Sequence, residues 1–242
     1  MMPLVVRRWW RRQQFRPGPH SILFNPSYLL RRRLLLALRE RLSQPCAIVV
    51  DVGCGSKPYQ ELIPAISYIG VEVRQAGHDH AQEQVDSLYD GSRLPIASAS
   101  ADLVLCSEVL EHAAAPAALV QDMMRVLRPG GRLVITTPFA WGEHERPHDE
   151  QRWTWYGLRR LLDENGCSDI EIQRVGHYME AVFQLFAAYV HQRLLPRSKL
   201  INALCVPFSV TPLLVLGRLG ALLPAHDCYY MNLVAVARKR TA

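Results

Sequence analysis

The feature that most constrains this chain is an apolar run that ends in a glycine-rich turn. Residues 48–52 are apolar except for Asp51, and Gly53 and Gly55 follow directly. Glycines after a strand let the backbone approach a ligand closely, because they carry no Cβ atom. The P-loop pattern is absent, and Pro58 stands where a dinucleotide fingerprint needs its third glycine. The turn therefore favours a nucleoside ligand without a pyrophosphate.

Short apolar runs alternate with helical stretches along most of the chain, as in a parallel sheet covered by helices. The 242 residues are 49% hydrophobic, which is enough to bury one generous core. Strands are predicted at 47–52, 68–73, 85–88, 102–106, 132–137, 169–175 and 229–237. Helices are predicted at 25–42, 59–63, 108–112, 117–127 and 153–164, after an irregular arm over residues 1–25. The pattern predicts an α/β fold.

The positive charge is concentrated near the start of the chain. Residues 1–41 hold ten arginines and one acidic residue, a net charge of +9, whereas the other 201 residues carry −3. Two tryptophans lie between two arginine pairs at positions 7–12. Indoles favour the bilayer interface and arginines pair with lipid phosphate, so residues 1–20 predict contact with an anionic membrane surface. Nucleic acid is a less favoured partner. An overall excess of Arg over Lys, 25 to 3, leaves compositional bias as a third interpretation.

Residues 177–228 form a second unusual segment, a hydrophobic stretch between the last two predicted strands. Positions 200–217 contain no charged residue, and a stretch of about 18 residues is at the lower edge of what a membrane span needs. Pro207 and Pro212 interrupt this stretch, and a true span would separate the final strand from its sheet. We therefore expect a helical insertion that dips into the membrane surface or forms a lid over the acceptor site. Ordinary core helices are the alternative.

The expected location is the cytoplasm, with peripheral association at the inner face of the membrane. The six cysteines are scattered without a C-x-x-C pair, which predicts neither a disulfide framework nor a zinc site. The apolar residues before the first arginine are too few for the core of a signal peptide.

Three further elements follow the glycine-rich turn in order. Glu72 ends the strand at 68–73, where a carboxylate can accept the hydroxyls of a ribose. The second is Asp90 with Leu94 and Pro95, followed by the strand at 102–106 with Glu111 and His112 after it. The set closes with the run Leu127-Arg128-Pro129-Gly130-Gly131, a turn that ends one helix and starts the next strand.

Taken together, this set resembles the class I S-adenosylmethionine-dependent methyltransferases, in particular their small-molecule, type 11-like group, over residues 46–176 and the last strand. The resemblance implies a doubly wound, mostly parallel seven-stranded sheet, the Rossmann-like methyltransferase fold. Residues 1–45 would then be a basic arm and helix before a domain at 46–242. The implied cofactor is S-adenosyl-L-methionine. Its binding residues would be Asp51, Gly53 and Gly55 at the methionine part, Glu72 at the ribose, Asp90 at the adenine amino group, and Cys106 and Ser107 beside the sulfonium.

The sequence departs from the family pattern at Lys57, where the third glycine would fall. The donor is positively charged at sulfur, so the Lys57 ammonium must point away from it, for example towards the methionine carboxylate. The resulting Gly-Cys-Gly-x-Lys-Pro-Tyr variant resembles bacterial members among sugar- or lipid-modifying enzymes. This resemblance favours a lipid-linked acceptor.

Methyl transfer to a hydroxyl needs a group that removes a proton from the acceptor. The predicted catalytic residues are His148 and Asp149 in the loop after the fifth strand, His144 in the same loop, and His112. That loop lies at the carboxyl edge of the sheet, where ligands bind in such folds. These residues also have structural interpretations. His148 and Asp149 could cap the start of the helix that follows them, and His112 could end the helix at 108–112. A metal site at His144, Glu145, His148 and Asp149 is an alternative, but its spacing is not diagnostic and no metal is predicted.

The sequence thus predicts an S-adenosylmethionine-dependent methyltransferase that methylates an oxygen of a small-molecule or lipid-linked acceptor, such as a sugar or isoprenoid. One alternative is an RNA methyltransferase that uses the basic arm. The Asn-Pro-Pro-Tyr motif of base-amino methylases does not follow the fourth predicted strand. The other alternative is a non-catalytic cofactor-binding protein. The intact Asp51, Glu72 and Asp90 argue against it.

Overall fold

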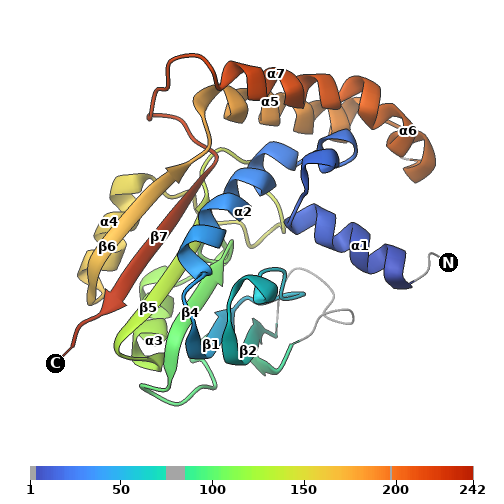
Figure 1. The fold of residues 1–242 in the computed structure, drawn as a ribbon. Helices are drawn as coiled ribbons and strands as arrows, with labels where there is room; N and C mark the ends of the chain where they lie inside the picture. Colours follow the sequence, from blue (N-terminus) through green and yellow to red (C-terminus); the bar gives the residue numbers. More distant parts are fainter. Residues whose placement is uncertain (1–3, 75–84, 197, 242) are drawn as a thin grey trace. The chain divides into compact units, whose positions relative to one another are not determined.

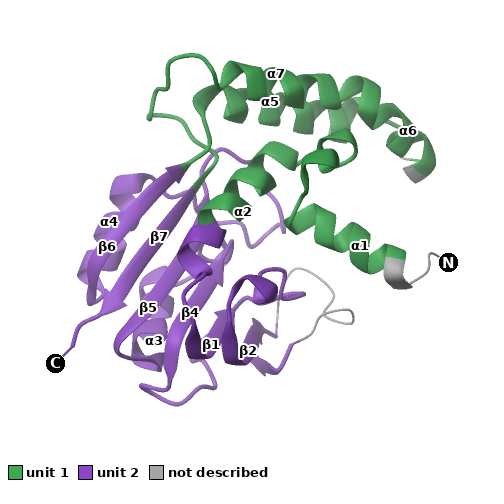
Figure 2. Ribbon diagram, viewed as in Figure 1, with its two compact units in different colours: residues 1–37, 175–232 green, residues 38–174, 233–242 purple. Residues whose placement is uncertain are grey.

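The computed structural model describes residues 4–74, 85–196 and 198–241, which group into two compact units (Figure 2). Unit 1 comprises residues 1–37 and 175–232, and unit 2 comprises residues 38–174 and 233–242. Residues 1–3 of the predicted arm and residue 197 of the predicted insertion lie outside the described residues. The arm and the insertion, far apart in sequence, thus belong to one unit, whereas the boundary predicted from the sequence lies between residues 45 and 46.

Unit 2 holds a seven-stranded sheet with the order β3-β2-β1-β4-β5-β7-β6 (Figure 1). Its strands are β1 (Cys46–Val52), β2 (Ala65–Val73), β3 (Ser87–Tyr89), β4 (Ala101–Ser107), β5 (Leu127–Pro138), β6 (Cys167–Val175) and β7 (Asn232–Lys239). The pairs β1–β2, β1–β4, β2–β3 and β4–β5 are parallel. Figure 1 shows β7 running against β6. The predicted α/β fold with a doubly wound, mostly parallel seven-stranded sheet is confirmed.

The central strands are apolar because both of their faces are covered. Val49, Val50 and Val52 of β1 are completely buried, as are residues 103–106 of β4. Such strands produce the continuous apolar runs that make them visible in a sequence. The predicted turn at 128–131 lies inside β5, where the pairing with β4 shifts from Leu127 to Arg132.

Short helices connect the strands of unit 2. They are η2 (Gln60–Leu62), η4 (Leu110–His112), α3 (Pro116–Val126) and α4 (Trp155–Glu164). Pro116 lies in the first turn of α3, where proline fits because its missing N–H needs no partner. Thr154 begins α4 by accepting a hydrogen bond from the amide of Gly157. The predicted helix at 108–112 is a single 3₁₀ turn.

Unit 1 is helical. Its elements are α1 (Leu4–Phe15), η1 (Pro19–Leu23), most of α2 (Tyr28–Leu42), α5 (Tyr178–Tyr189), the π-helical turn η5 (Val190–Leu194), α6 (Lys199–Ser209) and α7 (Thr211–Gly220). The predicted helical insertion before the last strand is confirmed by α5, α6 and α7.

The prediction of an irregular arm over residues 1–25 is wrong, because α1 occupies half of it. Gln13 of α1 is buried, and its side-chain oxygen accepts hydrogen bonds from the Gly18 amide (3.0 Å) and the Ser21 hydroxyl (2.7 Å). The Asn25 side chain donates back to the Gln13 carbonyl at 2.9 Å. These bonds fold α1 onto the turn that follows it.

A buried polar network holds α5 against α2 and α7. The completely buried Glu180 accepts a two-pronged hydrogen bond from Arg33 (2.7 and 3.0 Å) and a third bond from Arg218 (3.0 Å). One turn later, the buried Gln184 side chain accepts from the amide of Leu29 at 3.0 Å and donates to the carbonyl of Pro26 at 2.7 Å. Both side chains therefore satisfy groups on α2 or at its start, and Glu180 also binds α7.

Candidate active site

The glycine-rich turn leaves β1 at the carboxyl ends of the parallel strands. Gly53 and Gly55 adopt left-handed backbone conformations, with φ of +68° and +44°. A Cβ atom on Gly53 would lie 2.1 Å from the Cγ2 atom of Val109, in the segment that follows β4. Gly53 is therefore required both by its backbone angle and by the close approach of Val109.

Asp51 lies near the end of β1 and is buried. Its Oδ2 atom accepts a hydrogen bond from the Tyr68 hydroxyl at 2.6 Å. Burial raises the pKa of Asp51 to about 7, and burial followed by the charge of Asp51 raises the pKa of Tyr68. A cationic group of a ligand placed beside Asp51 would favour its ionised form.

Glu72 lies near the end of β2, and Asp90 directly follows β3. The Glu72 carboxylate is buried and accepts hydrogen bonds from the amides of Gly55 and Val73, both at 3.0 Å, so it is tied to the glycine-rich turn. Asp90 is exposed and accepts from the Ser92 amide (2.9 Å) and hydroxyl (2.6 Å), which lower the pKa of Asp90. The carboxyl ends of β1, β2 and β3 thus each present one acidic side chain along a single edge of the sheet.

Lys57 has a left-handed backbone, with φ of +51°, at the position where the family pattern has glycine. Its Nζ atom lies 2.5 Å from Oδ2 of Asp86, which also accepts from the Gly70 amide at 2.6 Å. The Lys57 ammonium is therefore neutralised by Asp86 rather than offered to a ligand carboxylate.

Cys106 and Ser107 end β4. Cys106 is completely buried, and burial raises the pKa of its thiol, so it stays protonated and unreactive. The Ser107 hydroxyl lies 2.9 Å from the hydroxyl of Thr136 on β5. Thr136 in turn donates to Oε1 of Glu108 at 3.0 Å, and Glu108 has a left-handed backbone with φ of +57°.

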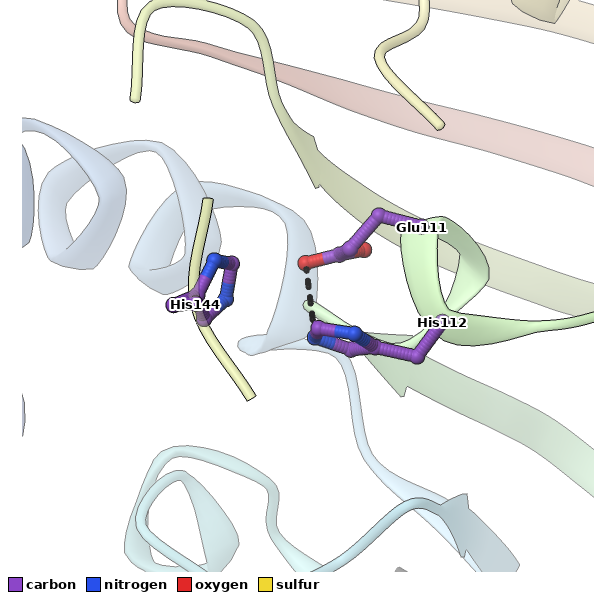
Figure 3. Close-up of side chains that lie close together, drawn as sticks. All are labelled: Glu111, His112 and His144. Carbon is purple, nitrogen blue, oxygen red and sulfur yellow. Dashed lines mark ion pairs between the residues drawn. The ribbon is translucent and has the colours of Figure 1, made fainter. Parts of the chain in front are cut away.

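Glu111, His112 and His144 meet at the segment after β4 and the loop after β5 (Figure 3), and we call them the Glu–His–His cluster. One ligand-type atom from each lies within 4.8 Å of the others. Nε2 of His112 lies 3.8 Å from Oε1 of Glu111, and the two imidazole rings meet edge to face at 4.9 Å. The carboxylate of Glu145 also lies 3.8 Å from the same His112 nitrogen.

Glu111 is the unusual member of the cluster. Its side chain is completely buried, and neither carboxylate oxygen has a hydrogen-bond partner. Burial, followed by the charge of Glu108, raises the pKa of Glu111 well above its ordinary value. Buried polar atoms without partners are rare and call for an explanation.

Asp149 is a fixed anion beside the cluster. Its side chain is bound by both terminal nitrogens of Arg152, at 2.5 and 2.6 Å, and by the amide of His144 at 2.8 Å. Burial opposes ionisation, but these hydrogen bonds prevail and lower the pKa of Asp149. Its Oδ2 atom lies 3.2 Å from Nδ1 of His144. Asp149 therefore suits the orientation of His144 better than proton removal.

The side chain of His148 is exposed, and the residue meets the cluster through its backbone. Its carbonyl oxygen lies 3.0 Å from Nδ1 of His112. The structure thus brings together His112 and His144 of the four predicted catalytic residues, places Asp149 behind His144, and leaves the His148 side chain outside. The alternative metal set of His144, Glu145, His148 and Asp149 does not converge, because Arg152 occupies Asp149.

Comparison with known proteins identifies the domain that carries this site. Residues 50–135 match the family model described as a methyltransferase domain. This chain carries a methyltransferase domain over these residues. A crystal structure of a SAM-dependent methyltransferase from Archaeoglobus fulgidus shares its fold, with a TM-score of 0.54 and 15% identity over 96% of this chain and 99% of that one.

Two curated relatives of the methyltransferase domain have named chemistry. A dimethylglycine N-methyltransferase from Parasynechococcus marenigrum is 34% identical over 119 residues, which are 44% of this chain and 42% of the relative. A malonyl-[acyl-carrier protein] O-methyltransferase from Hahella chejuensis is 35% identical over 100 residues, 37% of this chain and 36% of the relative. This chain spans about half the length, or less, of the curated relatives it matches.

The residues of the methyltransferase domain fit S-adenosyl-L-methionine, the cofactor of this family. Gly53 and Gly55 give the turn after β1 its left-handed backbone, and the buried Glu72 carboxylate lies at the adjacent strand end. These features provide close backbone approach and hydrogen-bond acceptors for a nucleoside.

Sequence reasoning missed several residues of unit 2 that shape this edge: Asp86, Glu108, Glu111, Thr136 and Arg152. Glu111 stood next to a predicted catalytic histidine, and this adjacency was the available signal. The role of Arg152 depends on a loop conformation that the residue types do not encode. Asp86 became important only because Lys57 turns towards it.

Proposed function

We propose that the methyltransferase domain transfers the methyl group of S-adenosyl-L-methionine to a hydroxyl oxygen of a small-molecule or lipid-linked acceptor. The observation that carries the proposal is the Glu–His–His cluster. It starts two residues after Val109, which packs against Gly53 of the cofactor turn. The sulfonium donor is already activated, so the protein must position the acceptor and help its hydroxyl to lose a proton.

The relatives support methyl transfer but differ in the acceptor atom. One is named as an N-methyltransferase and the other as an O-methyltransferase. Transfer to an oxygen rests on the cluster, since a hydroxyl keeps its proton at neutral pH. In this proposal Asp51, Gly53 and Gly55 line the methionine part of the donor and Glu72 holds the ribose. Asp90 binds the adenine amino group, and Cys106 and Ser107 lie beside the sulfonium.

Removal of the Glu72 carboxylate is expected to weaken cofactor binding. Glu72→Ala loses the acceptor for the ribose hydroxyls, so the affinity for S-adenosylhomocysteine should fall by about 1–3 kcal/mol, or roughly 5- to 150-fold. Isothermal titration calorimetry measures this change. Glu164→Ala, at an exposed position of α4, is the matched control and should bind as the wild type does. A wild-type protein that binds neither the donor nor its demethylated product would contradict the proposed function.

The methyl acceptor can be identified with a donor that carries a labelled methyl group. Purified protein is incubated with methyl-labelled S-adenosylmethionine and either a lipid extract or an aqueous extract, and the products are separated by chromatography. Label in an ether of a lipid fraction supports the lipid-linked acceptor, and label in the aqueous fraction supports a free small molecule. Binding of the cofactor without transfer from any extract would favour a non-catalytic protein.

We also propose that unit 1 holds the protein at the cytoplasmic face of a membrane. Large apolar side chains are exposed along α6 and α7, which we call the apolar stripe: Leu200, Leu204, Phe208, Leu216 and Leu219. Phe208 is 85% exposed, and the helices from residue 200 to 220 are long and apolar enough to cross a membrane by length and composition. Contiguous exposed apolar surface of this kind marks interaction sites.

A surface position suits these helices better than a span. Their opposite side is buried at Val206, Val210 and Leu214, and Thr211 donates to the carbonyl of Ile22 at 3.0 Å. The pair between Arg218 and Glu180 also ties α7 to α5. A helix that spanned the bilayer would lose these bonds, whereas one that lies at the interface keeps them. The exposed Arg8, Arg12 and Trp9 of α1 add interfacial groups to the same unit.

The protein is expected to sediment with anionic lipid vesicles, and high salt should weaken but not abolish this binding. Charge attraction is worth about 1 kcal/mol per basic residue and is screened by salt, whereas burial of apolar area is not. Arg8→Glu with Arg12→Glu should therefore remove the salt-sensitive part, and Leu204→Asp with Phe208→Asp the salt-resistant part. Ile66→Asp, at an equally apolar and 91% exposed position of β2, is the control. A protein that stays in the supernatant at low salt would contradict the membrane proposal.

A further inference from the structure

We infer that the Glu–His–His cluster is a binding site for a divalent transition-metal ion of the zinc or iron(II) class, held by Glu111, His112 and His144. Two histidines and one carboxylate are a recurrent ligand set for such ions, and they leave open positions for water or substrate. In the part of the chain that the structure describes, Glu111, His112 and His144 each place one possible metal-ligand atom within 4.8 Å of the other two.

The distances suit a metal after small side-chain movements. Zinc ligands lie about 2.1 Å from the ion, which places two ligands of a tetrahedron roughly 3.4 Å apart. Oε1 of Glu111 lies 3.8 Å from Nε2 of His112, and the carboxylate of Glu145 is equally near that nitrogen. The loop after β5 can thus supply a further oxygen to the same position.

His112 is oriented as a metal-binding histidine would be, by a contact at its other ring nitrogen. A metal-binding histidine almost always donates its other ring N–H to a carbonyl or carboxylate, which fixes the ring. Nδ1 of His112 faces the carbonyl of His148 at 3.0 Å, so that its Nε2 atom is directed to Glu111 (Figure 3). His144 is held through its backbone amide, which donates to Asp149 at 2.8 Å, and its Nδ1 atom lies 3.2 Å from the same carboxylate without forming a hydrogen bond.

Glu111 supplies the independent observation. Both of its carboxylate oxygens are buried and without hydrogen-bond partners, and one of them lies beside His112. An unpartnered buried carboxyl is expensive to keep in a protein. A bound divalent cation would provide the missing partner for it.

A metal at this position would bind the oxygen of the acceptor and lower the pKa of its hydroxyl, so that the proton can leave to water. This catalytic consequence rests on the proposed function, whereas metal binding itself does not. The two can therefore be tested separately.

Metal binding is measured on full-length protein that has been dialysed against a chelator. Titration with Zn²⁺ should show one tight site, and Co²⁺ should give the visible absorption of a site with nitrogen and oxygen ligands. Glu111→Gln and His144→Ala should each weaken Zn²⁺ binding at least about 10-fold, because each removes a direct ligand. His144 is partly exposed, so His144→Ala keeps the test valid if the buried Glu111→Gln variant fails to fold. The matched control is His148→Ala, which removes an exposed imidazole from the same loop and should leave the affinity unchanged.

Absence of a Zn²⁺ site in the wild type, or equal affinity in the wild type and His144→Ala, would overturn the inference. Methyl transfer that persists undiminished in metal-free protein would overturn the catalytic consequence and leave the proposed function intact. A protein that binds Zn²⁺ as expected but methylates no extract supports the metal site and contradicts the proposed function.

Discussion

Replacement of His112 by alanine is expected to lower the rate of methyl transfer by about 10²–10⁴-fold, as expected when a group that assists proton removal is lost. His112 is held through Nδ1 by the carbonyl of His148, and its Nε2 atom faces the centre of the Glu–His–His cluster. The loss is expected whether this nitrogen takes the proton itself or binds a metal. Initial rates with the identified acceptor measure the change, and the affinity for S-adenosylhomocysteine should be unaltered.

His148→Ala is the matched control for this prediction. The sequence placed His148 first among the candidate bases, but its side chain is exposed, and its contact with His112 is through a backbone carbonyl that alanine retains. Turnover should therefore stay close to that of the wild type. A loss in His148→Ala as large as that in His112→Ala would return the role of base to His148. Unchanged turnover in both variants would show that neither imidazole assists the reaction.

Replacement of Glu180 by alanine is expected to lower the free energy of unfolding by about 1.5–3 kcal/mol, because Arg33 and Arg218 lose the charged acceptor of their hydrogen bonds. Glu180 is completely buried and accepts three hydrogen bonds from these two arginines. Denaturant unfolding followed by circular dichroism measures the loss. Because the network lies in unit 1, the helical signal of that unit should disappear first.

Glu171→Ala is the control for burial. Glu171 also forms an ion pair, with Arg41 at 2.7 Å, but its side chain is 69% exposed. Exposed pairs contribute about 0–1 kcal/mol, so this variant should unfold nearly as the wild type does. Equal losses in the two variants would show that the Glu180 network contributes no more than a surface pair.

The sheet could be predicted from the sequence because its central strands are buried on both faces. Residues such as Val49 and Val50 of β1 or Leu103 and Val104 of β4 then form continuous apolar runs. Since parallel strands end at one edge, the order of the acidic residues along the chain placed Asp51, Glu72 and Asp90 at that edge, where the structure has them. Their contacts with the cofactor stay a prediction that follows from the family resemblance. Gly53 was equally visible, because a residue with this backbone and this close neighbour has to be glycine.

Features that depend on tertiary contacts could not be predicted in this way. The helix α1 was hidden because its arginines suggest a solvated arm, and its anchor is the buried side chain of Gln13. The choice between His112 and His148 depends on how the loop after β5 turns. Likewise, the burial of Glu111 follows from the packing around η4 rather than from its neighbours in sequence.

The position of β7 has a consequence for how the chain folds during synthesis. In the sheet, β7 lies between β5 and β6, yet it begins at Asn232, long after β5 ends at Pro138. Until β7 has been synthesised, the edge of β5 that faces away from β4 has no hydrogen-bonded neighbour. β6 cannot join the sheet before then, because β7 is the strand that connects it to β5. Unpaired strand edges of this kind invite association with other chains. A nascent chain of this protein therefore exposes unpaired strand edges of an incomplete sheet from the synthesis of Pro138 until β7 has been made, and a chaperone that covers these edges is most useful in that interval.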